Sequence, residues 1–243
     1  MLTPEEITRF REEGYLVFER LIDEEKLAGY LEVFNELVEL PRQRDDLPWN
    51  FALEIDENEQ PIPGLLHKVQ AVCVVEPRIL ELAKEPAILD RVENLIGPNI
   101  EAFGTKFFPK LAGGGTSTKW HQDTFYCGSA SRDILSCGIY LQDADEENGC
   151  LRVVPGSHLS GEIVEHTRDP RTHGSWVEVE KAQAVALPVP AGSAVIFSAN
   201  LLHGAMDNAS ERTRYSTAWH YCPTGLEMSE GLEKTDDRFV VRG

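Results

Sequence analysis

The chain has 243 residues, enough for one substantial hydrophobic core, and its 42% hydrophobic and 8% aromatic residues are typical of a globular protein. The formal net charge of −18 argues against nucleic acid and anionic membranes as partners, because both select for basic surfaces. No apolar run is long enough for a transmembrane helix, and the first ten residues are too polar for a signal peptide.

The cysteines indicate a reducing compartment. There are five, an odd number, and no two of them form a C-x-x-C pair. This pattern fits free or buried thiols and argues against a zinc–cysteine site. We therefore expect a cytoplasmic protein whose partner is a small molecule, and the residues leave the oligomeric state open.

The first twenty residues predict a helix followed by a strand. Thr3 and Glu6 form a capping-box pattern, and Pro4 occupies the first helical position. The helix is expected to end near Gly14, and residues 15–18 to form a short strand.

A second helix is expected to begin after Asp23, a favourable N-cap, and to end just before Pro41. Residues 41–64 are polar and contain prolines, which predicts a loop. One or two further helices are expected within residues 76–96, the last of them starting at Pro86.

Beyond these helices the chain consists of short β-prone segments separated by turn signals such as Asn148-Gly149 and Pro155-Gly156. This pattern predicts a mainly β fold with flanking α-helices, built on a sandwich or barrel. We expect one domain over residues 1–243, with a helical part over about 1–98 and a β-barrel part over about 99–225. The predicted strands are 100–109, 119–126, 133–142, 151–154, 185–189, 194–197 and 213–221.

The segment KWHQDTF contains the first candidate metal ligands. If residues 119–126 form a strand, His121 and Asp123 point to the same face and Gln122 points away. One more histidine would complete a 2-His-1-carboxylate triad, which suits Fe(II) and leaves coordination positions open. An H-x-D pair is weak alone, because a polar pair at a strand edge looks the same.

His203 is the best third ligand. It follows the β-prone run 194–197 and lies in the sequence Leu-Leu-His-Gly. The alternative is a core histidine whose hydrogen bonds are satisfied. His158 lies in a turn, where we expect a structural role. His166 and His173 lie in a charged loop, where we expect solvent exposure. His220 lies on the last predicted strand and could face either way.

Arg214 is a candidate carboxylate ligand. It lies on the strand expected after His203, with Ser216 on the same face. A guanidinium can hold a carboxylate through two parallel hydrogen bonds, and a serine hydroxyl can add a third. The alternative is a surface ion pair with one of the 41 acidic residues.

Together these elements resemble the phytanoyl-CoA dioxygenase family of Fe(II)- and 2-oxoglutarate-dependent oxygenases. The resemblance covers nearly the whole chain, and the order and spacing of its elements make it far more specific than the H-x-D pair. The matching elements are Leu2–Glu6 with Gly14–Val17, Lys68–Gln70, Trp120–Asp123, Asn148–His158, and His203-Gly204 followed by Arg214.

The resemblance implies a double-stranded β-helix, also called a jelly-roll or cupin-like barrel, that uses Fe(II), 2-oxoglutarate and O2. Iron would be bound by His121, Asp123 and His203. Arg214 would bind the distal carboxylate of 2-oxoglutarate, with Ser216 nearby.

The resemblance also places Lys68 near the cosubstrate, and we expect the segment from Phe103 to Lys106 to line the same pocket. Two departures stand out. Gly138 lies close to the position where many members carry a tryptophan, which would enlarge the pocket. Ala205 replaces a serine that often binds 2-oxoglutarate, which removes one hydrogen bond.

The expected reaction is hydroxylation of a small-molecule metabolite with release of succinate and CO2. Related halogenases replace the carboxylate ligand with Gly or Ala, so Asp123 favours oxygen transfer. Residues 41–64 and 159–183 are candidate lids, and Tyr126 and Tyr140 are candidates to face the cavity. Two alternatives remain: a catalytically silent barrel that binds 2-oxoglutarate or a metabolite, and a cupin-type metalloenzyme that does not use 2-oxoglutarate.

Overall fold

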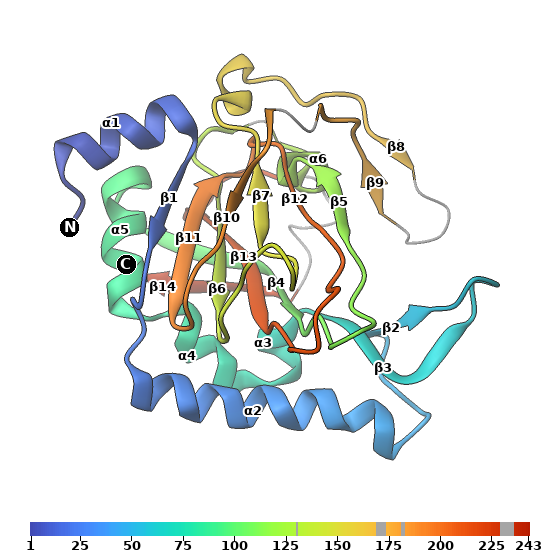
Figure 1. Cartoon of the computed structure of the whole chain (residues 1–243). Coiled ribbons are helices and arrows are strands. Elements are labelled where there is room, and N and C mark those ends of the chain that lie inside the picture. Colours follow the sequence, from blue (N-terminus) through green and yellow to red (C-terminus); the bar gives the residue numbers. More distant parts are fainter. Residues whose placement is uncertain (130, 169–173, 181–182, 229–235) are drawn as a thin grey trace.

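The computed structural model describes residues 1–129, 131–168, 174–180, 183–228 and 236–243. Two antiparallel sheets face each other in the described chain, and helices cover the outer side of the larger one (Figure 1). The larger sheet has the order β1 (Tyr15–Phe18), β11 (Ser193–Ser198), β6 (Leu135–Tyr140), β13 (Ser216–Pro223), β4 (Ile100–Phe108), β3 (Pro61–Gln70) and β2 (Phe51–Ile55), with β14 (Arg238–Arg242) also paired to β4.

The smaller sheet carries the candidate metal ligands. Its order is β10 (Val185–Leu187), β7 (Leu151–Val153), β12 (His203–Ala205) and β5 (Thr118–His121). A separate hairpin, β8 (Thr167–Arg168) with β9 (Ser175–Trp176), lies beside β5 (Figure 1). Two facing antiparallel sheets confirm the sandwich or barrel that the strand pattern predicts, in the jelly-roll form that the family resemblance implies.

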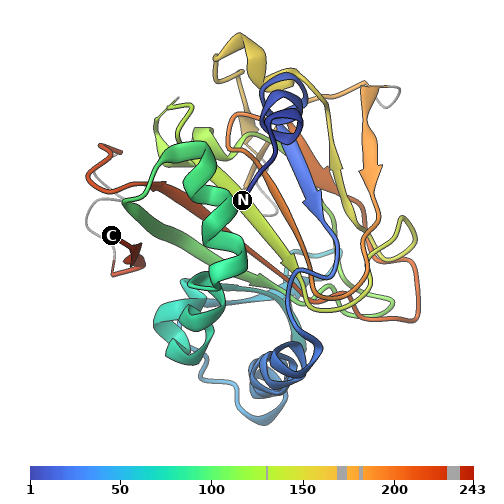
Figure 2. The ribbon, with the colours of Figure 1, turned by 90° about the vertical axis from the view of Figure 1, so that its left-hand side faces the viewer.

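The helices lie mainly before β4, and none of those described is long and apolar enough to cross a bilayer. Figure 1 shows α2 running along one end of the larger sheet, and Figure 2 shows α5 lying across the outer face of that sheet. The helical segments are α1 (Pro4–Glu13), α2 (Glu24–Gln43), α3 (Val72–Val75), η1 (Pro77–Ile79), α4 (Leu80–Ala83), α5 (Pro86–Ile96), α6 (Asp123–Cys127) and η2 (Ser157–Ser160).

The core has one layer on each side of the larger sheet. On the outer side, Phe34 of α2 packs on Phe107 of β4 with ring centroids 4.4 Å apart. On the inner side, Tyr140 and Val195 of the larger sheet pack with Val153 of the smaller one. The inner layer fills one part of the space between the sheets, and polar residues occupy the part near β5.

The predicted first helix is confirmed in detail. The Thr3 hydroxyl accepts a 3.2 Å hydrogen bond from the backbone N–H of Glu6, whose carboxylate accepts one of 2.7 Å from the N–H of Thr3. Gly14 ends the helix at φ +87°. Asp23 caps α2 and Pro86 starts α5, also as predicted.

Two predictions in this region were wrong. Helix α2 continues through Pro41 to Gln43, because Pro41 is buried on the apolar face and its packing outweighs the hydrogen bond that proline cannot make. Residues 41–64 are not a loop throughout, since they contain β2 and the start of β3. Phe51 pairs with Val69, and both side chains are buried, so tertiary packing overrides the polar and proline-rich composition. The larger sheet thus extends beyond the predicted barrel part.

Candidate active site

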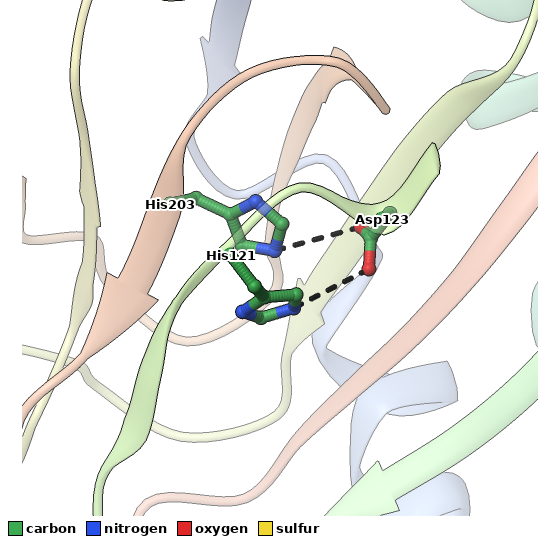
Figure 3. Close-up of side chains that lie close together, drawn as sticks. All are labelled: His121, Asp123 and His203. Atoms are coloured by element: carbon green, nitrogen blue, oxygen red, sulfur yellow. Dashed lines mark ion pairs between the residues drawn. The ribbon is translucent and has the colours of Figure 1, made fainter. Parts of the chain in front are cut away.

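Three potential metal ligands meet between the two sheets. His121 ends β5, His203 begins β12 opposite it, and Asp123 opens α6. One ligand atom from each residue lies within 4.8 Å of the others. The Nε2 atom of each histidine is 3.5 Å from a carboxylate oxygen of Asp123, Oδ1 for His121 and Oδ2 for His203 (Figure 3).

Backbone carbonyls set the protonation of both rings. Nδ1 of His121 lies 2.7 Å from the Lys119 carbonyl, and Nδ1 of His203 lies 2.9 Å from that of Leu201. A carbonyl can only accept, so each Nδ1 carries the proton and each Nε2 presents a lone pair towards Asp123. Two imidazole lone pairs and one carboxylate are thus directed towards the same position, and these are donors that a divalent metal ion can use.

Burial shapes the charge of this cluster. It lowers the pKa of His203 to about 4, with the His121 ring contributing, so His203 is neutral at pH 7. Burial would raise the pKa of Asp123, but the neighbouring histidines, His203 first, hold it well below its usual range. The cluster therefore offers one negative charge, on Asp123, and a neutral nitrogen donor at His203.

The predicted strand 119–126 was wrong after His121. The chain leaves β5 and enters helix α6 at Asp123, so strand alternation does not bring His121 and Asp123 together. Gln122 nevertheless points away from the cluster, as predicted. Its side-chain amide donates 2.8 Å to the Asn200 carbonyl and accepts 2.9 Å from the N–H of Val164. These bonds fix the turn that brings Asp123 back towards the histidines.

Arg214 is buried without an acidic partner among the described residues. Its side chain is only 3% exposed, which excludes the alternative of a surface ion pair. One terminal nitrogen donates 2.6 Å to the Ser216 hydroxyl, the guanidinium lies 5.5 Å from the Tyr140 ring centre, and Nε has no hydrogen-bond partner. A buried, unpaired guanidinium is costly, so this arrangement points to an anionic ligand.

Two lysines lie on the inner face of β3 and β4. Lys106 is the cross-strand partner of Gln70, and Lys68 lies two residues before Gln70. Nζ of Lys106 is 3.2 Å from Nε2 of His220. Burial and the charge of Lys106 lower the pKa of Lys68 to about 8, and Lys68 makes no ion pair within the described chain.

Lys110 is a further buried cation near Arg214 that no sequence motif marks. Its ammonium is buried, and it donates a hydrogen bond to the Met206 carbonyl. Burial lowers its pKa to about 7, with Arg214 as the next cause. A Cβ on Gly149 would lie 2.7 Å from this ammonium. Lys110 follows β4 without a motif of its own, so its position beside Arg214 had no sequence signal.

Aromatic side chains border the cluster on the side of the β8–β9 hairpin. The Tyr126 ring stands edge-on to His121 at 5.7 Å, and its hydroxyl bonds to both the N–H and the carbonyl of Ser175. The N–H of Val177 donates 2.8 Å to the Trp120 carbonyl. The hairpin is therefore attached to β5, the strand that carries His121.

The predicted solvent exposure of His166 was wrong. It accepts a 3.0 Å hydrogen bond from the backbone N–H of Gln122 and stacks on Phe125 at 4.1 Å. Burial lowers its pKa. His173 lies outside the described residues. Nε2 of His158 donates a 3.2 Å hydrogen bond to the Arg11 carbonyl, so His158 has the expected structural place next to α1.

The iron- and 2-oxoglutarate-dependent oxygenases combine two facing sheets, two histidines and a carboxylate between the sheets, and a buried arginine nearby. The chain has all of these features and is an enzyme of this class. A model of the phytanoyl-CoA dioxygenase (PhyH) family matches residues 10–216, so the chain belongs to that family.

Similar proteins include enzymes with different substrates. L-proline trans-4-hydroxylase of Streptomyces griseoviridis is 31% identical in an alignment 173 residues long that covers 61% of this chain and 62% of that protein. A probable alpha-ketoglutarate-dependent hypophosphite dioxygenase of Stutzerimonas stutzeri is 26% identical, and the match covers 85% of this chain and 73% of that protein. The structure of EctD from S. alaskensis with 2-oxoglutarate and 5-hydroxyectoine shares the fold, with a TM-score of 0.73 at 21% identity over 96% of this chain and 81% of that one.

Proposed function

We propose that His121, Asp123 and His203 hold Fe(II), that Arg214 and Ser216 bind the distal carboxylate of 2-oxoglutarate, and that the enzyme hydroxylates a small metabolite. The observation that carries the proposal is the buried convergence of the three donors within 4.8 Å. Two imidazoles and one carboxylate are the ligand set of non-haem Fe(II) oxygenases, and no cysteine joins it to favour a softer metal.

The residues present fit the cosubstrate as well. The guanidinium of Arg214 has an unused buried N–H and no acidic partner in the described chain. A carboxylate would accept a hydrogen bond from that N–H and neutralise the buried charge. The Ser216 hydroxyl, 2.6 Å from that guanidinium, can donate to the same carboxylate. The Tyr140 ring packs beside the guanidinium and excludes water from it.

Iron with bound 2-oxoglutarate supplies activation of O2 for C–H oxidation, while the cosubstrate leaves as succinate and CO2. The protein supplies orientation and charge. Lys68 and Lys106 place positive charge on the inner face of β3 and β4, where we propose that they attract the cosubstrate. Ala205 carries no hydroxyl, so Arg214 and Ser216 are left as the polar contacts to the distal carboxylate.

The substrate enters this proposal only as a class. Proline, ectoine and hypophosphite appear in the names of similar enzymes, and what they share is small size. We propose a small metabolite that binds between His121 and the β8–β9 hairpin, where Tyr126 and Trp176 offer aromatic surface. Residues 41–64 do not suit a lid over the site. Phe51 is buried in the core, and the Trp49 side chain is 80% exposed to solvent and so does not cover a pocket. A cytoplasmic location is supported by five buried, free cysteines.

The test is an anaerobic titration of the apoprotein with Fe(II) and then 2-oxoglutarate. We expect a weak visible charge-transfer band that needs both components and is lost in Asp123→Ala and Arg214→Ala. His121→Ala should also abolish substrate-dependent succinate formation. A folded protein without the band would favour a silent barrel or a metalloenzyme that does not use 2-oxoglutarate.

A further inference from the structure

A chain of three hydrogen bonds connects the candidate ligand Asp123 to a lysine on a neighbouring strand. The Ser136 hydroxyl lies 2.6 Å from Oδ2 of Asp123 and 3.1 Å from Nδ1 of His220. Nε2 of His220 in turn lies 3.2 Å from Nζ of Lys106. Ser136 and His220 are cross-strand partners on β6 and β13, and Lys106 lies on β4, the other neighbour of β13.

Lys106 determines the direction of every bond in this chain. A lysine ammonium can only donate, so Nε2 of His220 accepts and its Nδ1 carries the ring proton. The Nδ1–H then donates to the Ser136 oxygen, which leaves the hydroxyl proton of Ser136 for the carboxylate of Asp123. The three bonds are mutually consistent, and neighbouring bonds in such a chain strengthen one another.

We propose that Ser136, His220 and Lys106 are positioning residues that fix the orientation of the Asp123 carboxylate for metal binding. The inference rests on the proposed metal role of Asp123. Both carboxylate oxygens lie 3.5 Å from a histidine Nε2, Oδ1 from that of His121 and Oδ2 from that of His203. Because Oδ2 also accepts the Ser136 hydrogen bond, Oδ1 is the oxygen whose lone pairs stay free for a metal. A carboxylate that binds through one oxygen keeps further coordination positions open for the cosubstrate and O2.

The surroundings keep this chain dry and its ring in place. Ser136 is 2% exposed and His220 is 4% exposed, so water does not compete for these bonds. Gly104 has φ +61°, and a Cβ there would lie 2.9 Å from Cδ2 of His220. The Phe103 ring packs on His220 with centroids 5.1 Å apart. The backbone at Gly104 thus leaves the space that the imidazole occupies.

The test measures metal affinity in the full-length apoprotein, without cosubstrate, by anaerobic titration with Co(II) and its visible absorption. We expect Ser136→Ala to bind Co(II) about 10–100-fold more weakly, as for other partners of metal ligands. Lys106→Met should also weaken binding, whereas Lys106→Arg, which keeps a cation that only donates, should restore it to within a few-fold. Thr217→Val is the control, since it removes a buried hydroxyl that has no hydrogen-bond partner.

The outcomes separate this inference from the proposed function. If wild-type protein binds Co(II) and the Co(II) affinity of Ser136→Ala is within twofold of the wild-type affinity, the positioning role is overturned and the metal site is retained. Lys106→Arg as weak as Lys106→Met would also contradict it. If Ser136→Ala does not fold, the two Lys106 variants still decide. A wild-type protein that binds no Co(II) would overturn both proposals.

Discussion

His121 of β5 and His203 of β12 are direct antiparallel partners, and their ring centroids lie 4.2 Å apart. His203 also pairs with Val153 of β7 on its other side, so backbone hydrogen bonds hold it from two strands. Two of the three candidate ligands are therefore positioned by sheet register, and only Asp123 depends on a turn. Ligands on strands are held more rigidly than ligands on loops, which favours a site formed before the metal binds.

Arg214→Met should separate cosubstrate binding from stability. The substitution removes a buried charge that has no acidic partner in the described chain, so the free energy of unfolding should stay within about 1 kcal/mol of wild type or rise. The affinity for 2-oxoglutarate should fall roughly 30-fold or more, because truncating one side of a buried charge pair costs about 2–5 kcal/mol. Urea denaturation and 2-oxoglutarate titration of the Fe(II) protein measure the two quantities.

Arg238→Met is the matched control, because Arg238 forms an ordinary ion pair with Glu101 at 2.6 Å, away from the candidate site. It should lower stability and leave 2-oxoglutarate affinity unchanged. The carboxylate role of Arg214 would be refuted by a variant that binds the cosubstrate as tightly as wild type.

The candidate site could be predicted where its residues lie in local motifs. His121 and Asp123 stand two apart, and His203 follows an apolar strand, so sequence alone placed these residues together. The helix at Asp123 could not be predicted, because DTFYC is rich in β-prone residues and forms only one short helix. Its conformation depends on the bonds of Gln122 to distant backbone.

Contacts that depend on strand pairing and tertiary packing could not be predicted from local sequence patterns. Ser136 lies on β6 of the larger sheet and reaches Asp123, which follows β5 of the smaller sheet, across the space between the two sheets. Lys110 reaches the neighbourhood of Arg214 through tertiary packing. Neither contact has a spacing that a single sequence reveals. The same holds for β2 and β3, whose pairing buries Phe51 and Val69 despite nearby prolines and polar residues.

Lys110 should make stability depend on pH. Its pKa is about 7 in the folded protein and 10.5 when unperturbed, so between these values the unfolded chain binds more protons. The free energy of unfolding should therefore rise with pH from about 7 towards 10.5, by up to about 1.4 kcal/mol per pH unit from this group. Below pH 7 both states are protonated, and the contribution is constant.

The measurement is urea denaturation at several pH values for wild type and Lys110→Met. The difference between the two curves should slope across this window, while any contribution from Lys68 cancels because both proteins contain it. Lys84→Met, which removes a surface lysine paired with Glu81, should run parallel to wild type. Parallel curves for Lys110→Met would show that the ammonium is not destabilised by burial.

Two glycines should respond oppositely to alanine. Gly104 has φ +61°, and a Cβ would lie 2.9 Å from His220, so Gly104→Ala should lower the free energy of unfolding by about 1–3 kcal/mol. Gly138 has ordinary backbone angles, and its Cβ would meet Tyr140 at 3.6 Å, an ordinary contact. Gly138→Ala should therefore leave stability unchanged or raise it by about 0.5 kcal/mol. Urea denaturation of the pair is the measurement, and an equal loss in both variants would contradict the assignment of strain to Gly104.

Tyr126→Phe should loosen the β8–β9 hairpin without disturbing the cosubstrate. The Tyr126 hydroxyl accepts 2.8 Å from the N–H of Ser175 and donates 3.1 Å to its carbonyl, and both bonds are lost in the variant. Each is worth about 1 kcal/mol, so hydrogen exchange at the Ser175 amide should accelerate roughly 5–30-fold. The Val177 amide, which donates 2.8 Å to Trp120, should stay protected and serves as an internal reference.

The functional consequence follows from where the hairpin lies. The ring of Tyr126 packs edge-on to His121 at 5.7 Å, and phenylalanine keeps that contact, so the affinity for 2-oxoglutarate should not change. If the substrate binds against the hairpin, its KM should rise and succinate should form in excess over hydroxylated product. Tyr30→Phe on α2, on the outer side of the larger sheet, should alter neither exchange nor coupling. Faster exchange at Ser175 with unchanged KM and coupling would place the substrate elsewhere around the metal.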